Sequence, residues 1–308
     1  MDGTPQIMVA ISPAWQQTLK APIGCVGVGL HTGRRVSLNL RPADPGHGIV
    51  FRRTDLGRDI QARFDRVVDT RLATVLGDQR WASARVGTVE HLLAALAALG
   101  IDNVLVELDG PEVPALDGSA APFVFLLDCA GVMEQSVPRA QIEIRRPVTV
   151  SDGDAFAELR PSVSGRPGLE MALSIDFAAA AIGRQALSLR LTPETFRSEL
   201  ARARTFTMAE EVTQLRAAGL AQGGSLDNAV VVDQARILNP GGLRMRDEFA
   251  RHKLLDAVGD LALAGAPLCG RFIAHRSGHA LNNRLLRALF ADVSAWRTVD
   301  AEPVSVAA

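Results

Sequence analysis

The chain contains no tyrosine, only three cysteines and only two lysines among its 308 residues. Without tyrosine, no phenol is available as an acid or as a donor to an oxyanion. Cys25, Cys129 and Cys269 are odd in number and far apart, which indicates neither a disulfide framework nor a thiolate metal site and favours a reducing cytoplasm. Arginine supplies all the permanently charged basic side chains other than Lys20 and Lys253. A lysine at position 253, beside a histidine, therefore indicates a role that a guanidinium cannot fill.

Neither sign of charge is in large excess, and no apolar run is long. The formal net charge is −1 and the isoelectric point about 6.6, so there is no basic stripe for nucleic acid and no polybasic patch for a membrane surface. The longest apolar run, LLAALAALGI, is far shorter than the roughly 18 residues of a spanning helix, and MDGTPQIMVAISPAW lacks a basic start. We therefore expect a cytoplasmic protein that is not inserted in a membrane and does not bind nucleic acid.

The order of helix, strand, loop and helix occurs twice along the chain. A proline-containing segment near residues 134–142 separates the two occurrences and begins a new run of alternating strands. The sequence therefore predicts a duplicated α+β fold with two domains, 14–138 and 139–298, followed by a flexible tail, 299–308. Each domain is expected to contain a small sheet with helices, in sandwich-like α/β layers, with the active site where the domains meet.

Local patterns predict the elements that carry polar side chains. CVGVGLHTGRRVSLNL alternates around a Thr-Gly turn, which predicts a β-hairpin with His31 at its tip; its glycines do not match the dinucleotide-binding spacing. GTVEHLLAALAALG has helical periodicity and ends at Gly100. In the second half, a helix is expected through RHKLLDAVGD, then the strand CGRFIAH, the loop SGHALN and a final helix, NRLLRALFADVSAW.

The segment 205–235 is predicted to be a βαβ insert within the second domain. Val212 and Leu215 lie on one face of its helix, and Gly219 favours a C-terminal stop. The apolar face of such a helix must be shielded from water. It either packs on the body of the protein or forms the wall of a groove for an apolar ligand.

The helix through RHKLLDAVGD carries a candidate metal site. His252 and Asp256 are four residues apart, so both side chains lie on one face and are close enough to share an ion. His91 occupies the matching helix of the other half and is the candidate third ligand, with Glu90 beside it as a general base. Two imidazoles and one carboxylate leave a fourth position for water, as in catalytic zinc sites. The alternative is a polar helix face exposed to solvent.

Seven motifs together resemble one enzyme family. They run in order over about residues 15 to 295, and a series of motifs is far more specific than any one of them. The motifs are GLHTG (Gly29 to Gly33), TVEHLLAAL (Thr88 to Leu96), DGSAAPF (Asp117 to Phe123), ARTF (Ala203 to Phe206), GGSLDNAVV (Gly223 to Val231), RHKLLDAVGD (Arg251 to Asp260) and SGHALNN (Ser277 to Asn283). The chain resembles the UDP-3-O-acyl-N-acetylglucosamine deacetylases, zinc amidases of lipid A biosynthesis in Gram-negative bacteria.

The resemblance implies a zinc centre and a general base. The zinc ligands of the family correspond to His91, His252 and Asp256, and its general base corresponds to Glu90. One zinc ion per chain is therefore expected, although iron(II) accepts the same ligands.

The resemblance also implies residues for the acid step and for the oxyanion. His279 corresponds to the positively charged histidine that protonates the departing amine or stabilises the transition state, and Asp260 corresponds to its orienting partner. Lys253 corresponds to the family lysine. Thr205 corresponds to the threonine whose hydroxyl helps to hold the oxyanion.

Substrate contacts are expected on both halves. His31 and Phe206 match positions near the sugar and the nucleotide, and the insert matches the passage for the 3-O-acyl chain, for which Val212, Leu215 and Leu226 are candidates. The expected substrate is a UDP-linked acylated amino sugar, which loses its N-acetyl group as acetate. Arg71 and Ala73 differ from the forms associated with the family, which affects only details of the substrate pocket.

Two other functions stay open from the sequence. One is a zinc amidohydrolase that acts on another N-acyl sugar without a long acyl chain. The other is a metal-free binding protein for nucleotide sugars, in which the polar helix face is only solvated. The protein is expected to be a monomer, and its C-terminal tail is a candidate site for a regulatory protease.

Overall fold

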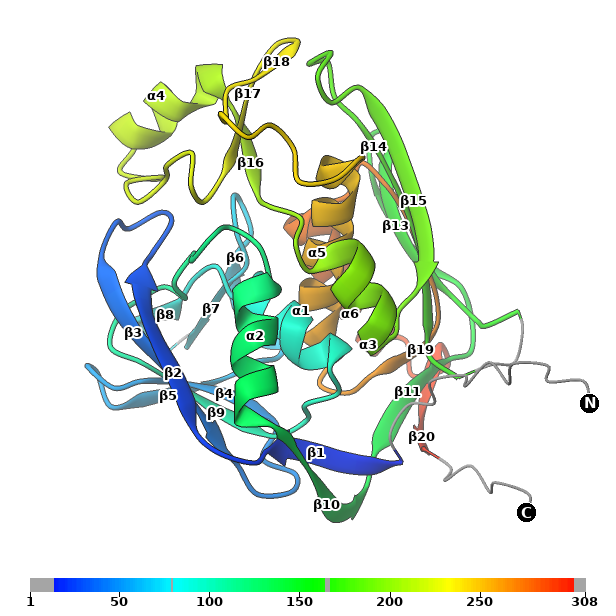
Figure 1. Ribbon diagram of the computed structural model, residues 1–308. Helices are drawn as coiled ribbons and strands as arrows, with labels where there is room; N and C mark the ends of the chain where they lie inside the picture. The colour runs from blue at the N-terminus through cyan, green and yellow to red at the C-terminus, as the bar shows by residue number, and fades with distance from the viewer. Residues whose placement is uncertain (1–13, 79, 164–166, 302–308) are drawn as a thin grey trace, which may run out of the picture.

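The structure is a computed structural model that describes residues 14–78, 80–163 and 167–301. It contains α-helices and several small sheets, so the predicted α+β class is confirmed. Figure 1 shows helices gathered between the sheet of the first half and the sheet of the second half. No helix in the described ranges is both long and apolar enough to span a membrane.

The first half is built around a five-stranded sheet. Its order is β2 (Ile23–Val28), β3 (Arg35–Pro42), β9 (Val104–Leu108), β4 (Ile49–Arg53) and β5 (Arg58–Gln61). β2 and β3 pair in antiparallel fashion, so the predicted hairpin around His31 is confirmed. Beside this sheet are η1 (Phe64–Arg66), a three-stranded sheet of β6 (Val67–Asp69), β7 (Val75–Asp78) and β8 (Trp81–Val86), and a pair of β1 (Trp15–Leu19) and β10 (Val132–Pro138).

The second half is built around a seven-stranded sheet. Its strands are β12 (Val148–Asp152), β13 (Ala155–Arg160), β19 (Leu268–His275), β11 (Ala140–Ile144) and β20 (Trp296–Asp300), with β14 (Leu169–Asp176) and β15 (Arg184–Arg190) joined through β19. Along β14, buried residues alternate with partly exposed ones. One face of the sheet therefore contributes to the core, because successive side chains of a strand point to opposite faces.

Six α-helices are described. They are α1 (Glu90–Ala98), α2 (Ala121–Ala130), α3 (Pro193–Thr195), α4 (Ala209–Ala217), α5 (Glu248–Ala262) and α6 (His279–Ala291), and a π-helical turn, η2 (Phe196–Leu200), follows α3. α1 is buried along almost its whole length, which explains why apolar residues surround its axis. One continuous core cluster includes Phe51 and Leu93 from the first half and Phe249 and Leu285 from the second.

α1 and α5 lie side by side at the centre of the molecule (Figure 1). A β-carbon at Gly259 would lie 1.9 Å from the carbonyl oxygen of Glu90, far closer than any non-bonded contact of a real β-carbon. Glycine at this position of α5 therefore allows the N-terminal turn of α1 to approach closely. The close approach brings residues of the two halves to a common site.

Segment 205–235 contains β16 (Phe206–Met208), α4 and β17 (Val230–Asp233), followed by β18 (Arg236–Ile237). β16 and β17 pair in parallel, and α4 forms the crossover connection that parallel strands need. These elements lie at the upper edge of the view in Figure 1. The division into domains 14–138 and 139–298, their duplication and the separate nature of the insert stay predictions.

The C-terminal elements differ from the prediction. The expected loop 277–282 is wrong from His279 onward, because α6 begins there, after Gly278 in an extended conformation. The final helix ends at Ala291, and Ser294 donates from its backbone and side chain to Asp292 Oδ1, forming a turn. The chain then enters β20, whose pairing with β11 continues to Asp300. Val299 and Asp300, assigned to the tail, thus belong to a strand, and residues 302–308 lie outside the described ranges.

Candidate metal centre and active site

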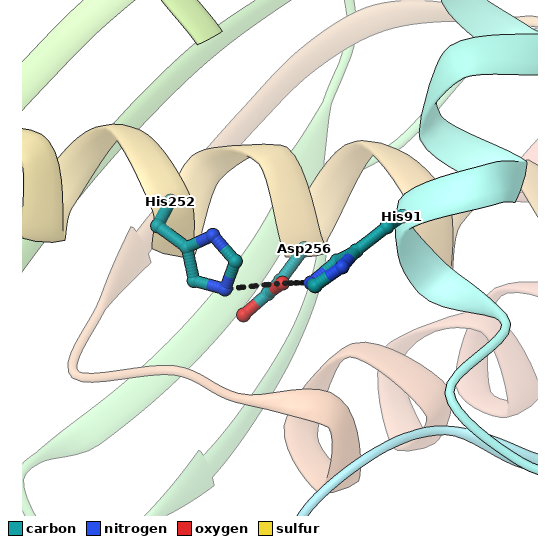
Figure 2. Close-up of side chains that lie close together, drawn as sticks. All are labelled: His91, His252 and Asp256. Carbon is teal, nitrogen blue, oxygen red and sulfur yellow. Dashed lines mark ion pairs between the residues drawn. The ribbon is translucent and has the colours of Figure 1, made fainter. Parts of the chain in front are cut away.

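α1 and α5 place three ligand-type side chains within reach of one another. Figure 2 shows His252 and Asp256 projecting from one helix toward His91 on the other. Asp256 Oδ1 lies 3.3 Å from His252 Nε2 and 3.5 Å from His91 Nε2, and the three ligand atoms lie within 4.8 Å of one another. All three side chains are buried. The structure thus brings together, across the two halves, the three residues proposed from the sequence.

The donor set suits a divalent cation. Within the described residues, buried Asp256 Oδ1 has no hydrogen-bond partner, which is costly unless an ion or a water satisfies it. His252 Nδ1 lies 3.0 Å from the carbonyl oxygen of Ala203, so this nitrogen carries the proton and Nε2 faces Asp256 with its lone pair. Burial lowers the pKa of His252 to about 4, which keeps the imidazole neutral at pH 7. These residues therefore fit a metal ion.

Lys253 holds the second oxygen of the same carboxylate. Its ammonium donates to Asp256 Oδ2 at 2.9 Å. Burial alone would raise the pKa of Asp256, but His252 and Lys253 outweigh it and lower that pKa well below its usual range. Burial likewise would lower the pKa of Lys253, but Asp256 outweighs it and raises that pKa. Lys253 therefore stays charged and leaves Oδ1 free to face the imidazoles.

Glu90 is the first residue of α1 and is 3% exposed. Its Oε2 accepts a hydrogen bond from the backbone amide of Thr74 at 3.0 Å, and its Oε1 lies 3.9 Å from His279 Nε2. Burial raises the pKa of the Glu90 carboxyl, and this effect exceeds the opposing influence of His279 and His91. A buried carboxylate with a raised pKa beside a candidate metal centre is suited to accept a proton.

His279 forms an ion pair with Asp260. His279 Nδ1 lies 2.8 Å from Asp260 Oδ2, which also accepts a hydrogen bond of 2.9 Å from Asn282 Nδ2. Burial lowers the pKa of His279, but Asp260 and Glu90 outweigh it and raise that pKa to about 9. His279 is therefore protonated at neutral pH, as an acid or a cationic stabiliser must be.

The segment from Ala203 to Phe206 runs beside His252. Arg204 and Glu248 form a buried ion pair with a nitrogen-to-oxygen distance of 2.9 Å, which ties this segment to the start of α5. The Phe206 ring packs edge-on against His252, with 6.2 Å between centroids. Thr205 donates its backbone amide to the carbonyl oxygen of Gly118 and is partly exposed. Phe206 thus contacts a candidate metal ligand, and Thr205 immediately precedes Phe206 in the chain.

His31 lies in the turn between β2 and β3. Its backbone amide donates to Glu112 Oε1 at 2.9 Å, and its buried Nδ1 has no hydrogen-bond partner within the described residues. Burial lowers the pKa of His31, and the charge of His279 lowers it further, against the opposing effect of Glu112. The turn therefore carries His31 toward the side of the site on which His279 lies.

The three predicted acyl-passage residues lie apart from these groups in the insert. Val212 and Leu215 on α4 are half-buried, and the side chain of Leu226 is 42% exposed. No contact described in the structure joins them to the candidate metal ligands. Their role stays a prediction.

Sequence reasoning missed three residues of this region. Thr74 bonds to both Glu90 and Asp260, and Asn282 supports Asp260. Glu112 accepts hydrogen bonds from the backbone amides of His31 and Thr32 and from the hydroxyls of Thr32 and Thr88. Asn282 lies within the motif SGHALNN, and Thr74 follows Ala73 in a stretch that the resemblance links to the substrate pocket, whereas Glu112 lies outside the quoted motifs; no periodicity or spacing marked any of the three.

Candidate metal ligands, a carboxylate suited to accept a proton and an imidazole with a raised pKa share one buried site, a combination that is typical of hydrolytic enzymes. The family model described as UDP-3-O-acyl N-acetylglycosamine deacetylase matches residues 16–291. The chain therefore belongs to the UDP-3-O-acyl-N-acetylglucosamine deacetylase family, and the prediction of an enzyme of this family is confirmed.

Curated relatives agree with this assignment. A protein of Myxococcus xanthus named UDP-3-O-acyl-N-acetylglucosamine deacetylase is 52% identical over 288 residues, which cover 93% of this chain and 90% of the relative. Proteins of the same name from Acidithiobacillus ferrooxidans and Phenylobacterium zucineum are 51% and 53% identical, over 92% of this chain and 93% and 96% of their own lengths. Membership of an enzyme family argues against the metal-free binding protein.

Proposed function

We propose that the protein catalyses zinc-dependent hydrolysis of the N-acetyl group of UDP-3-O-(3-hydroxyacyl)-N-acetylglucosamine in lipid A biosynthesis. The products are acetate and the free amine. The observation that carries the proposal is the buried Asp256 Oδ1, which has no hydrogen-bond partner among the described residues and lies between two imidazole nitrogens, in a chain of this family. His91, His252 and Asp256 are the proposed ligands of one zinc ion, with iron(II) as the alternative metal.

The reaction requires a nucleophile, a proton acceptor and a proton donor. Bound zinc lowers the pKa of water to roughly 7 and polarises a carbonyl group. Glu90 accepts a proton from the attacking water, whose oxygen forms a bond to the acetyl carbon. The Thr205 hydroxyl stabilises negative charge that develops on the carbonyl oxygen, while charged Lys253 holds the Asp256 carboxylate. When the carbon–nitrogen bond breaks, His279 supplies the proton that converts a poor leaving group into an amine.

The proposed substrate assigns roles to the remaining predicted residues. His31 and Phe206 contact the sugar and nucleotide, and Val212, Leu215 and Leu226 line the acyl passage. The partly exposed apolar side chains of the insert support this assignment, since an acyl chain needs an apolar wall. A monomeric state, a cytoplasmic location and protease recognition of the tail stay predictions; most of the tail, 302–308, lies outside the described residues.

Metal removal and replacement test the proposed reaction. Chelator-treated protein should lose deacetylation of the UDP-linked acylated sugar, and stoichiometric zinc should restore it, with acetate release as the measurement. Protein that stays equally active after complete removal of metal would contradict zinc dependence. Equal activity on the substrate without its 3-O-acyl group would instead favour the amidohydrolase of other N-acyl sugars.

The alkaline limb of the pH profile should report His279. Since its folded-state pKa is about 9, the required protonated form is present below that value and is lost as pH rises through it. Asp260→Asn removes a charge that raises this pKa, so the loss of kcat should begin at a lower pH than in the wild type. The measurement is kcat against pH for both proteins. An alkaline limb at the same pH in both would contradict the assignment.

A further inference from the structure

Thr74 joins the proposed base to the partner of the proposed acid. The residue immediately precedes β7 and is 1% exposed. Its backbone amide donates to Glu90 Oε2 at 3.0 Å, and its hydroxyl donates to Asp260 Oδ1 at 2.5 Å. A single residue thus contacts a carboxylate on α1 and a carboxylate on α5.

Each bond leaves the other oxygen of its carboxylate directed toward His279. Glu90 Oε1 lies 3.9 Å from His279 Nε2, while Asp260 Oδ2 accepts from His279 Nδ1 at 2.8 Å. Thr74 therefore donates to one oxygen of each carboxylate. The His279 imidazole lies between the two other oxygens, Glu90 Oε1 and Asp260 Oδ2. The carbonyl oxygen of Thr74 also accepts from the backbone amide of Val89, at 3.4 Å, just before α1 begins.

Such an arrangement restricts rotation of both carboxylates. A hydrogen bond from a hydroxyl to a carboxylate at this length belongs to the strong, charge-assisted class. Proton transfer requires groups held within about 0.5 Å of the productive geometry, which a freely rotating side chain does not provide. Asn282 adds a second donor to Asp260, but on Oδ2, so it does not replace the bond to Oδ1.

We propose that Thr74 is a positioning residue that aims Glu90 and, through Asp260, His279 for their proton transfers. The inference rests on the proposed deacetylation, because it assigns these two residues the base and acid steps. Thr74 itself does not contact the reacting atoms. Its hydroxyl acts through Asp260, and its backbone amide acts on Glu90.

The first test compares Thr74→Val, which removes the hydroxyl and keeps the amide, with Thr74→Ser, which keeps both. Loss of a supporting partner typically lowers activity by about 10- to 100-fold, so we expect a kcat decrease of that size in Thr74→Val. KM and bound zinc should stay at wild-type values, and Thr74→Ser should restore most of kcat. Unchanged kcat in Thr74→Val, or a matching loss of zinc, would overturn the proposal.

A double-mutant cycle tests whether the hydroxyl acts through Asp260. If it does, Thr74→Val should reduce kcat much less in an Asp260→Ala background, which offers the hydroxyl no acceptor, than in the wild type. Fully additive effects would show that Thr74 does not act through Asp260. A general destabilisation by Thr74→Val would lower kcat equally in both backgrounds and would therefore appear as additive effects.

A measurement without substrate separates this inference from the proposed reaction. The Nδ1 proton of His279 in its hydrogen bond to Asp260 should give a downfield NMR signal, identified by its absence in His279→Gln. Thr74→Val should shift this signal, and Thr74→Ser should not. An unchanged signal in Thr74→Val would overturn the role of Thr74, whereas a wild-type protein without deacetylase activity would overturn only the proposed reaction.

Discussion

His91→Ala should remove bound metal and nearly all deacetylase activity. His91 is the only one of the three proposed ligands that α1 contributes, and its Nε2 lies 3.5 Å from Asp256 Oδ1. Without it, only two protein ligands from one turn of α5 remain, and water would have to replace the third. Catalytic zinc sites use three protein ligands, so the ion should be bound much more weakly. Metal catalysis supplies several kcal/mol of transition-state stabilisation, so a decrease in kcat/KM of about 10³-fold or more is expected.

Metal content by elemental analysis and acetate release measure the effect of His91→Ala. His47→Ala is the matched control, since His47 is exposed and its imidazole bonds only to the neighbouring Gly48 carbonyl oxygen among the described side-chain hydrogen bonds. The control should keep both metal and activity. Full metal content and full activity in His91→Ala would contradict the proposed ligand set.

Glu90→Gln should lower kcat by about 10²- to 10⁴-fold, the usual contribution of a general acid or base. The substitution keeps the size of the side chain and an oxygen that can accept from the Thr74 amide, but an amide cannot take a proton from water. The fold and bound metal should therefore be retained. Because burial raises the pKa of Glu90, removal of this buried charge is not expected to destabilise the protein greatly.

The measurements for Glu90→Gln are kcat, metal content and thermal unfolding. Glu194→Gln on α3 is the matched control, because Glu194 is exposed and no described contact joins it to Glu90 or to the candidate metal ligands. It should behave as the wild type. Activity of Glu90→Gln within about tenfold of the wild type would show that another group accepts the proton.

The spacing of residues predicted the local part of the candidate site. His252 and Asp256 are one helical turn apart, and the structure places both on α5 with their ligand atoms facing each other. The Thr-Gly turn predicted the hairpin that carries His31. These features depend on the helical and strand periods, which act over a few residues.

The C-terminal region shows where local signals were insufficient. The segment SGHALN suggested a loop, yet His279 begins α6 and its imidazole pairs with Asp260. The apolar periodicity up to Trp296 suggested one helix, but Trp296 pairs with Ile144 in β11. Strand pairing with a distant segment decided the conformation of that residue, and the periodicity of its own segment did not show it.

The amino-acid order by itself determined which residues are capable of the chemistry and which of them share a helix face, because side-chain type and helical period are local properties. Tertiary structure decided that His91 meets His252 and Asp256, through the close approach that Gly259 allows between α1 and α5. It also decided the role of Thr74, whose partner Asp260 lies 186 residues away in the chain. Such contacts arise only when separate hydrophobic faces pack together, and no periodic pattern within either segment encodes them.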